Sequence, residues 1–227
     1  MTGAIISLLS QKGGVGKSAI ARLLAVEFVR ASWTVKIADI DTMQGTSTKW
    51  KLRRDAAQVK PEIPVEKFAT VNRALREAAK FDLLLLDGPA HAEKGGLAMA
   101  KKSKLILMPT CYGLDDLDAQ TEAAYELEEN GIETGRIWFI FSRTSGSANE
   151  EQAAREYLQR AGINVFEPVF AELPCIRQAH SGGKAASEVS FPAIRERAIA
   201  LAVAVATKLQ ELTDIKAEAI DAEAEAA

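Results

Sequence analysis

The stretch QKGGVGKS at residues 11–18 decides the fold and the first functional assignment. It follows a short apolar run at residues 4–9 and opens a stretch, Lys17 to Ala31, whose apolar residues recur at helical spacing. In a glycine-rich turn between a strand and a helix, backbone N–H groups can surround phosphate oxygens, helped by the positive end of the helix dipole. Lys17 is then placed to reach the β- and γ-phosphates, and the Ser18 hydroxyl to ligate Mg²⁺. The sequence therefore predicts a nucleotide-binding phosphate loop.

The rest of the chain alternates apolar runs with stretches of helical periodicity. Further apolar runs lie at residues 35–38, 83–86, 105–108, 137–141 and 165–170, and helical stretches at residues 70–80, 116–130, 150–161 and 192–212. Short apolar runs without polar alternation are typical of parallel strands that are buried on both faces. We therefore predict an α/β fold: a single doubly wound, mostly parallel sheet of about seven strands flanked by helices.

Composition sets the domain organisation and the general class. The 227 residues suit one domain, predicted over residues 1–212, and the Ala- and Glu-rich tail at residues 213–227 is expected to be a frayed helix or disordered. With 28 basic and 31 acidic residues, nucleic-acid binding would need a local basic patch. Two cysteines and two histidines are too few for a disulfide framework or a zinc site. No apolar stretch reaches about 18 residues, and the N-terminus reads as a strand rather than a signal peptide, so a cytoplasmic protein is expected.

Three carboxylates follow predicted strands. Asp39 and Asp41 come after the run at residues 35–38, and Asp87 closes the run of four leucines at residues 83–86. Ligands of doubly wound sheets bind beyond the carboxyl ends of the strands, where the phosphate loop also lies. These acidic groups are thus expected beside the bound phosphates and their metal ion.

KGGVGKS resembles the deviant Walker A motif of the ParA/MinD family, which has an additional lysine, here Lys12. The resemblance implies an ATPase whose two subunits sandwich two ATP molecules, with Lys12 reaching into the partner's site. It implies catalytic roles for Lys12, Lys17 and Asp41, the last orienting the attacking water. It further implies that Ser18, Asp39 and Asp87 hold Mg²⁺. The nucleotide, ATP or ADP, would contact Gly13, Gly14, Val15, Gly16, Lys17, Ser18 and Ala19, with Arg143 and Pro174 beside the adenine.

The sequence departs from the family pattern at two loops. Asp41 is followed by Thr-Met-Gln where the family has Pro-Gln, and Ala90 replaces the second proline after Asp87. These changes affect loop geometry more than the carboxylates. A weaker match is the stretch from Thr46 to Arg54, which includes Trp50 and resembles a segment of small ParA-type proteins.

The tail distinguishes among the branches of the family. MinD-type relatives bind membranes through a basic C-terminal helix, whereas this tail is acidic, so no membrane partner is expected. The resemblance then favours a nucleoid-associated ParA-type ATPase that binds DNA non-specifically as an ATP dimer and is released by a ParB-like adaptor. Arg195, Arg197 and Lys208 on the last helix are the candidate DNA contacts. The alternatives are a ParA-like role in conjugative DNA transfer, a scaffold that positions a non-DNA cargo, and a small-molecule ligase or kinase.

Overall fold

The computed structural model describes residues 3–89, 93–144 and 146–213. Its centre is a seven-stranded sheet in the order β3-β2-β4-β1-β5-β6-β7, in which every pair of neighbours is parallel. The predicted doubly wound sheet is thereby confirmed. The strands are β1 (Ala4–Leu8), β2 (Val35–Asp39), β3 (Val65–Lys67), β4 (Leu83–Asp87), β5 (Leu105–Thr110), β6 (Ile137–Phe141) and β7 (Asn164–Val165).

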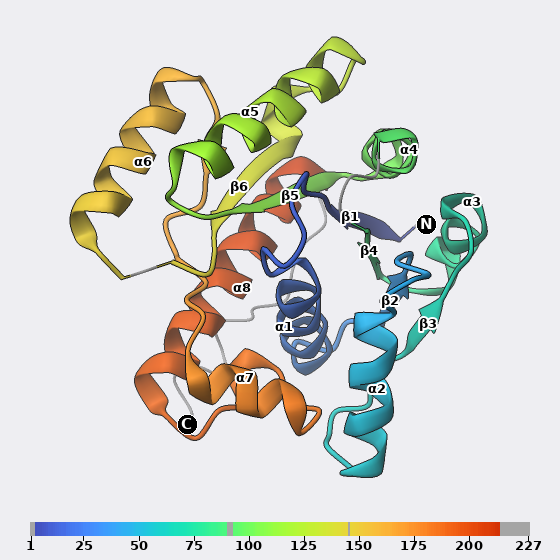
Figure 1. The fold of residues 1–227 in the computed structure, drawn as a ribbon. Helices are drawn as coiled ribbons and strands as arrows, with labels where there is room; N and C mark the ends of the chain where they lie inside the picture. The colour runs from blue at the N-terminus through green and yellow to red at the C-terminus, as the bar shows by residue number, and fades with distance from the viewer. Residues whose placement is uncertain (1–2, 90–92, 145, 214–227) are drawn as a thin grey trace.

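Helices cover both faces of the sheet (Figure 1). One apolar core lies between the sheet and α1, α2, α7 and α8, and a second lies between the sheet and α3 to α6. The helices are α1 (Lys17–Arg30), α2 (Thr46–Ala56), α3 (Val71–Leu75), α4 (Glu93–Lys102), α5 (Leu114–Glu129), α6 (Ala148–Arg160), α7 (Pro174–Ser181) and α8 (Pro192–Thr213), with 3₁₀ turns η1 (Ala78–Lys80), η2 (Thr134–Arg136) and η3 (Ala186–Glu188).

The leucine run of β4 shows why the strands lack polar alternation. Leu83 and Leu85 pack into the core beneath α1 and α8, whereas Leu84 and Leu86 pack into the opposite core. All four side chains are fully buried. Successive strand residues point to opposite faces, so a strand covered on both sides needs apolar residues throughout.

Some predicted elements differ from those in the structure. The strand predicted at residues 165–170 is only Asn164–Val165, because Pro168 lacks an N–H and the chain leaves the sheet before Phe170 forms a bridge with Ser142. The helix predicted at residues 70–80 divides into α3 and η1. Helices α2, α4 and α7 and strand β3 were not predicted. For α2 the reason is that it buries few side chains and carries many charges.

Parallel pairing brings the carboxyl ends of the strands to one edge of the sheet. Asp39 and Asp87 are direct neighbours in the β2–β4 register, and Asp87 lies opposite Leu8, two residues before Ser10 and the phosphate loop. Ligand-binding groups are therefore gathered where the fold class predicts them.

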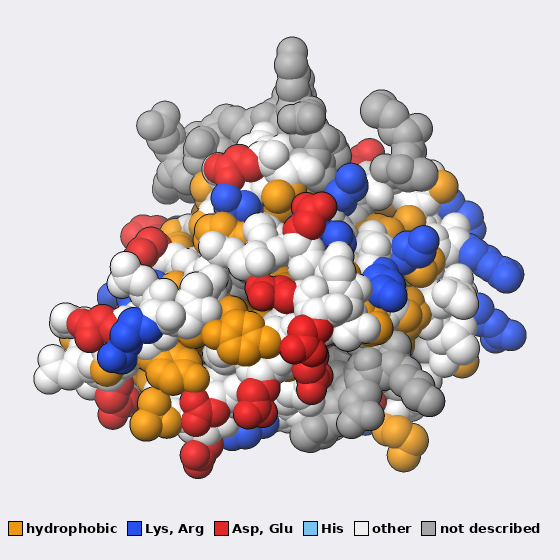
Figure 2. Space-filling model, turned by 90° about the horizontal axis from the view of Figure 1, so that it is seen from above, with side chains coloured by type: hydrophobic (Ala, Val, Ile, Leu, Met, Phe, Trp, Pro, Cys, Tyr) orange, Lys and Arg blue, Asp and Glu red, His pale blue; other side chains and the backbone are white. Residues whose placement is uncertain are grey.

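The surface is mixed in charge. Viewed from above, Asp and Glu side chains are numerous over the part that carries α5 and α6, and Lys and Arg gather toward the opposite edge (Figure 2). No helix of the described residues is long and apolar enough to cross a membrane. The predictions for the tail from residue 214 and for Ala90 concern residues outside those described.

Candidate nucleotide-binding site

The phosphate loop adopts a conformation that requires glycine at two positions. Gly14 and Gly16 have φ angles of 77° and 98°, in the left-handed region. A Cβ atom at Gly14 would lie 2.9 Å from Nη1 of Arg143. Gly16 is the N-cap of α1, so the backbone turns directly into the helix whose first residue is Lys17. This is the strand–loop–helix arrangement that the sequence predicted.

Side chains from distant segments hold the loop in place. The Ser142 hydroxyl, at the end of β6, donates to the Val15 carbonyl, and the Arg143 guanidinium donates to the Gly14 carbonyl. On the other side, Gln120 of α5 donates to the Leu9 carbonyl (3.2 Å) and accepts from the Gln11 N–H (3.2 Å). Contacts from the end of β6 and from α5 thus hold the phosphate loop in a defined conformation, which lowers the ordering cost of ligand binding.

Lys17 has the surroundings expected of a phosphate-binding lysine. Its side chain is buried, and among the described residues its ammonium donates to the Lys12 carbonyl alone, at 3.4 Å. Burial lowers the pKa of Lys17, and the nearby charges of Asp87 and Asp41 oppose that shift. A buried cation that forms no ion pair among the described residues favours an anionic ligand.

Two buried carboxylates offer free oxygens beside Ser18. Oδ2 of Asp39 accepts from the N–H and hydroxyl of Thr48, both at 2.9 Å, and Oδ2 of Asp87 accepts from the Ser47 hydroxyl at 2.7 Å. Oδ1 of each carboxylate is buried with no hydrogen-bond partner in the described residues. Hard oxygen donors left unpaired next to a phosphate loop fit Mg²⁺, which commonly binds one or two carboxylates together with substrate phosphates.

Asp87 is the more perturbed of these two groups. Burial raises its pKa to about 6, and the hydroxyls of Ser47 and Ser18 oppose that rise. Ionising this buried carboxyl group is costly when no counterion is present. A cation bound beside it would offset that cost and favour the ionised form, which is the form that acts as a ligand.

Asp41 is held by the turn that replaces the family's proline. Its Oδ1 accepts from the N–H groups of Met43 (3.1 Å) and Gln44 (2.9 Å), and its side chain lines the cavity. The altered loop therefore keeps a carboxylate at the expected place, and Gln44 lines the same cavity.

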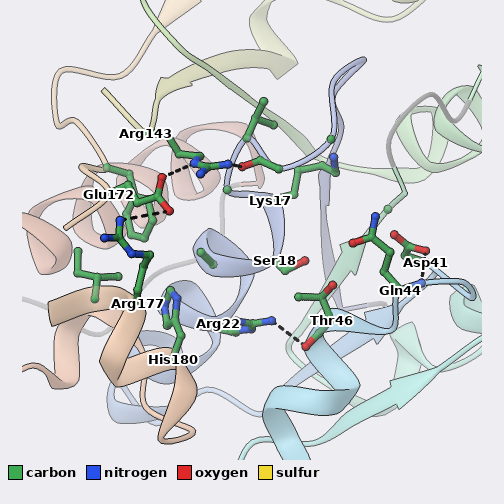
Figure 3. A pocket seen from close by; sticks show the side chains of 18 residues that line it. Lys17, Ser18, Arg22, Asp41, Gln44, Thr46, Arg143, Glu172, Arg177 and His180 are labelled. Atoms are coloured by element: carbon green, nitrogen blue, oxygen red, sulfur yellow. Dashed lines mark hydrogen bonds and ion pairs between the residues drawn. The ribbon is translucent and has the colours of Figure 1, made fainter. Parts of the chain in front are cut away.

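A cavity of about 250 Å³ extends from the phosphate loop across α1 to α7 (Figure 3). The predicted residues Gly13 to Ala19, Asp41 and Arg143 line it. Pro174 does not: it is exposed at the first turn of α7, and Ile176 and Arg177 of that helix face the cavity instead. Lining residues absent from the sequence-based assignment are Arg22, Gln44, Thr46, Gly88, Phe170, Glu172, Ile176, Arg177 and His180.

Some of these additional lining residues could have been predicted from the sequence. Arg22 lies four residues after Ser18, so helical spacing places it on the same side of α1. Glu172 and Arg177 flank Pro174, which the resemblance places beside the adenine, but only the structure shows the ion pairs of Glu172 with Arg143 and Arg177.

Lys12 does not line the nucleotide cavity of its own chain. Its side chain is 43% exposed, and its ammonium pairs with Asp116 of α5 at 2.7 Å. Its hydrogen bond with Asp116 raises the pKa of Lys12, which keeps the side chain cationic. The two lysines of the loop thus have different surroundings: Lys17 faces the cavity and Lys12 faces away from it.

The predicted DNA contacts lie at two ends of α8. Arg197 is exposed and Arg195 is half-buried near its start. Lys208 lies three turns further along, pairs with Glu211 and stands 4.5 Å from the centre of the Trp138 ring. DNA binding by these residues stays a prediction.

Fold and site together define a phosphate-loop nucleotide-binding protein with a doubly wound sheet. The CobQ/CobB/MinD/ParA nucleotide-binding domain model matches residues 6–184, and the chain belongs to that family of ATPases. Comparison with curated protein sequences found no match.

This chain matches nearly the whole length of several solved structures that share its fold. MinD from Pyrococcus horikoshii, complexed with Mg-ADP, is 19% identical, with a TM-score of 0.70 over 94% of this chain and 100% of that chain. An ATP complex of a McdA variant from Cyanothece is 17% identical, with a TM-score of 0.70 over 95% and 98%. A ParA family ATPase from Chlorobium tepidum is 16% identical, with a TM-score of 0.66 over 88% and 98%. At these identities the likeness establishes the fold.

Proposed function

We propose that the chain is a Mg²⁺-ATP-dependent dimerising ATPase of the ParA type that partitions or positions DNA. The observation that carries the proposal is the placement of Lys12: it belongs to the phosphate loop, yet it does not line the cavity of its own chain, and its partly exposed side chain pairs with Asp116. A cation in that position can serve a second subunit's nucleotide, which would make dimerisation depend on the γ-phosphate.

The residues divide the reaction among them. Lys17 and the N–H groups of residues 13–19 hold the phosphates, and Asp41 orients the attacking water. Ser18, Asp39 and Asp87 would hold Mg²⁺, which neutralises charge on the β- and γ-phosphate oxygens. Lys12 from the partner stabilises the charge that develops in the transition state.

The ATP dimer would bind DNA non-specifically and a ParB-like adaptor would trigger hydrolysis and release. Arg195 and Arg197 are the first candidates for the phosphate contacts of DNA, and Lys208 is the third. Similarity to a ParA family ATPase supports this role, whereas similarity to McdA and MinD is compatible with a different cargo. A ParA-like function in conjugative DNA transfer is an alternative within the same mechanism.

Sedimentation with ADP, ATP and a slowly hydrolysed ATP analogue tests the proposal, with plasmid DNA in a second series. ATP is expected to dimerise the wild type but not Lys12→Ala, while exposed Lys49→Ala serves as the matched control. DNA uptake by the dimer should fall steeply with salt. A dimer that ignores DNA would favour a scaffold for another cargo, and nucleotide-independent assembly would refute the role of Lys12.

A further inference from the structure

One flank of the nucleotide cavity is lined by two nitrogen-bearing side chains, Arg22 and His180, that the ATPase mechanism does not use. Arg22 projects from α1, and His180 projects from the last turn of α7 toward the same space (Figure 3). Thr46, at the start of α2, completes this flank. The flank therefore lies between three helices, with Arg22 one helical turn beyond Ser18 of the phosphate loop.

Arg22 is a buried cation with little compensation. Its residue is only 3% exposed. Nη2 donates to the Thr46 carbonyl at 2.7 Å, and the guanidinium stands 5.6 Å from the centre of the Trp50 ring. Nε is buried without a hydrogen-bond partner, and Arg22 forms no ion pair within the part of the chain that is described. Burial lowers the pKa of Arg22 to about 10, although the charges of Asp87 and Asp39 partly oppose that shift.

His180 repeats this pattern across the cavity. Its Nε2 is also buried without a hydrogen-bond partner in the described residues. Burial lowers the pKa of His180 to about 4, and the positive charges of Arg22 and Arg53 add to the shift. Arg53 is close behind, since its Nε donates to the His180 carbonyl at 3.3 Å. Arg22, Arg53 and His180 thus lie close together, and the two arginines make the cationic form of the histidine less favourable.

The neighbouring carboxylates are committed elsewhere. Asp39 and Asp87 accept from α2 and face the proposed Mg²⁺ position. Glu172 pairs with Arg143 and with Arg177. A buried guanidinium without a carboxylate partner is costly unless a ligand supplies the anion.

We propose that Arg22 and His180, backed by Arg53, form a second oxyanion subsite in the nucleotide cavity that accepts a phosphate group. The guanidinium offers a donor fork suited to phosphate, and the imidazole offers a further donor. The phosphate is either free or carried on the ribose of the bound nucleotide. A bound phosphate would contact α1, α2 and α7 together. It would therefore link α1, which follows the phosphate loop, to α7 on the other side of the cavity.

The first experiment fills the phosphate loop with Mg²⁺ and a slowly hydrolysed ATP analogue and then titrates inorganic phosphate by calorimetry. The wild type should bind one further phosphate per chain. Arg22→Gln should weaken that binding by at least about tenfold, because it removes the charge-assisted hydrogen bonds, and Arg22→Lys should lie between the two. Arg73→Gln, an exposed arginine on the opposite face of the sheet, is the matched control and should bind like the wild type.

The second experiment compares ADP with ADP that carries an additional 2′- or 3′-phosphate. If the group belongs to the nucleotide, the wild type should prefer one of the phosphorylated forms by about tenfold or more, and Arg22→Gln should bring the ratio close to one. Using a ratio within each variant corrects for any loss of folded protein.

The proposal is overturned if the wild type takes up no phosphate beyond the loop and shows no preference for either phosphorylated nucleotide. It is equally overturned if Arg22→Gln and His180→Gln match the wild type in both experiments. Neither measurement uses DNA, and the comparison of ADP with its phosphorylated forms needs no ATP-driven dimer, so a failure of the partition role would leave the test intact.

Discussion

The two halves of the nucleotide cavity are built in opposite ways. The phosphate half is made by residues 13–19, which are continuous in sequence and whose backbone supplies the donors. The other half is assembled from side chains on three separate segments: Arg22 on α1, Arg143 after β6, and the stretch of Glu172, Arg177 and His180 in and just before α7. The first half depends on local backbone conformation, whereas the second depends on how tertiary packing places distant elements.

A buried ion-pair network holds the second half together. Arg54 of α2 is fully buried and donates from Nη1 and Nη2 to Glu188 at 2.7 and 2.9 Å. It also donates to the carbonyls of Gly183 and Pro61, both at 3.0 Å. The segment that follows α7 is thereby fastened to α2, at a distance in sequence of 129 residues.

Removing Arg54 should have the largest effect on stability. Arg54→Met keeps much of the apolar stem but leaves Glu188 buried and without its main partner, which is expected to cost about 3–5 kcal/mol of unfolding free energy. Arg30, 3.5 Å from Glu188, would retain part of the compensation, so the lower end is expected. Urea unfolding measures the change, and Lys49→Met on the exposed face of α2 should shift stability by less than about 0.5 kcal/mol. Equal effects of the two substitutions would contradict the role of the network.

Lys17→Ala tests the phosphate half. Loss of the buried ammonium should weaken ATP binding by at least about a hundredfold, or ~2.7 kcal/mol, because it removes the buried charge that faces the phosphates. Lys12→Ala in the same loop is the matched comparison, and its effect on ATP binding by the monomer should be severalfold at most. Fluorescent-nucleotide titration below the dimerisation concentration gives both values. Similar losses would show that Lys12 also serves its own cavity.

The phosphate half could be predicted from sequence because the residues that bind phosphate are consecutive in the chain. Gly14 and Gly16 occupy left-handed positions, and Lys17 and Ser18 begin the helix, so the pattern and the geometry coincide. The run of four leucines likewise predicted a strand buried on both faces, because every residue of such a strand must be apolar.

The other half left weaker traces in the sequence. Nothing local places Arg22 beside His180, since 158 residues separate them and only packing of α7 against α2 brings them together. Helix α2 was missed because Trp50 and Arg54 are stabilised by distant partners, Lys184 and Glu188, rather than by an apolar stripe. Pro174 was assigned to the adenine by resemblance, yet the register of α7 turns Ile176 and Arg177 toward the cavity.

His180 should make the second half sensitive to pH. Its pKa lies near 4 in the folded chain and near 6.5 when unfolded, so between these values the unfolded state binds more protons. This contribution to stability is complete above about pH 6.5 and is lost as the pH falls toward 4. Since the ring is partly exposed, about 2 kcal/mol is expected at most.

The measurement compares unfolding free energies of wild type and His180→Gln from pH 7.5 to 4.5. The wild type should lose more stability than the variant over this range. Asp87, whose pKa is raised to about 6, acts in the opposite direction, but it is common to both proteins and cancels in the difference. Parallel pH profiles would show that the histidine is readily protonated in the folded state.

The smallest expected effect concerns Lys12, whose side chain lies in neither half of the nucleotide cavity. Asp116 holds Lys12 against α5, and releasing it should favour the partner's site. Because an exposed ion pair is worth about 1 kcal/mol or less, Asp116→Asn should tighten ATP-dependent dimerisation by about two- to fivefold for each lysine released. Asp115→Asn, on the same first turn of α5, is the control and should change little. Sedimentation across a concentration series with the ATP analogue resolves such a shift. A weaker dimer in Asp116→Asn would mean that Asp116 positions Lys12 for the partner, and the contact would then belong to the assembled state rather than compete with it.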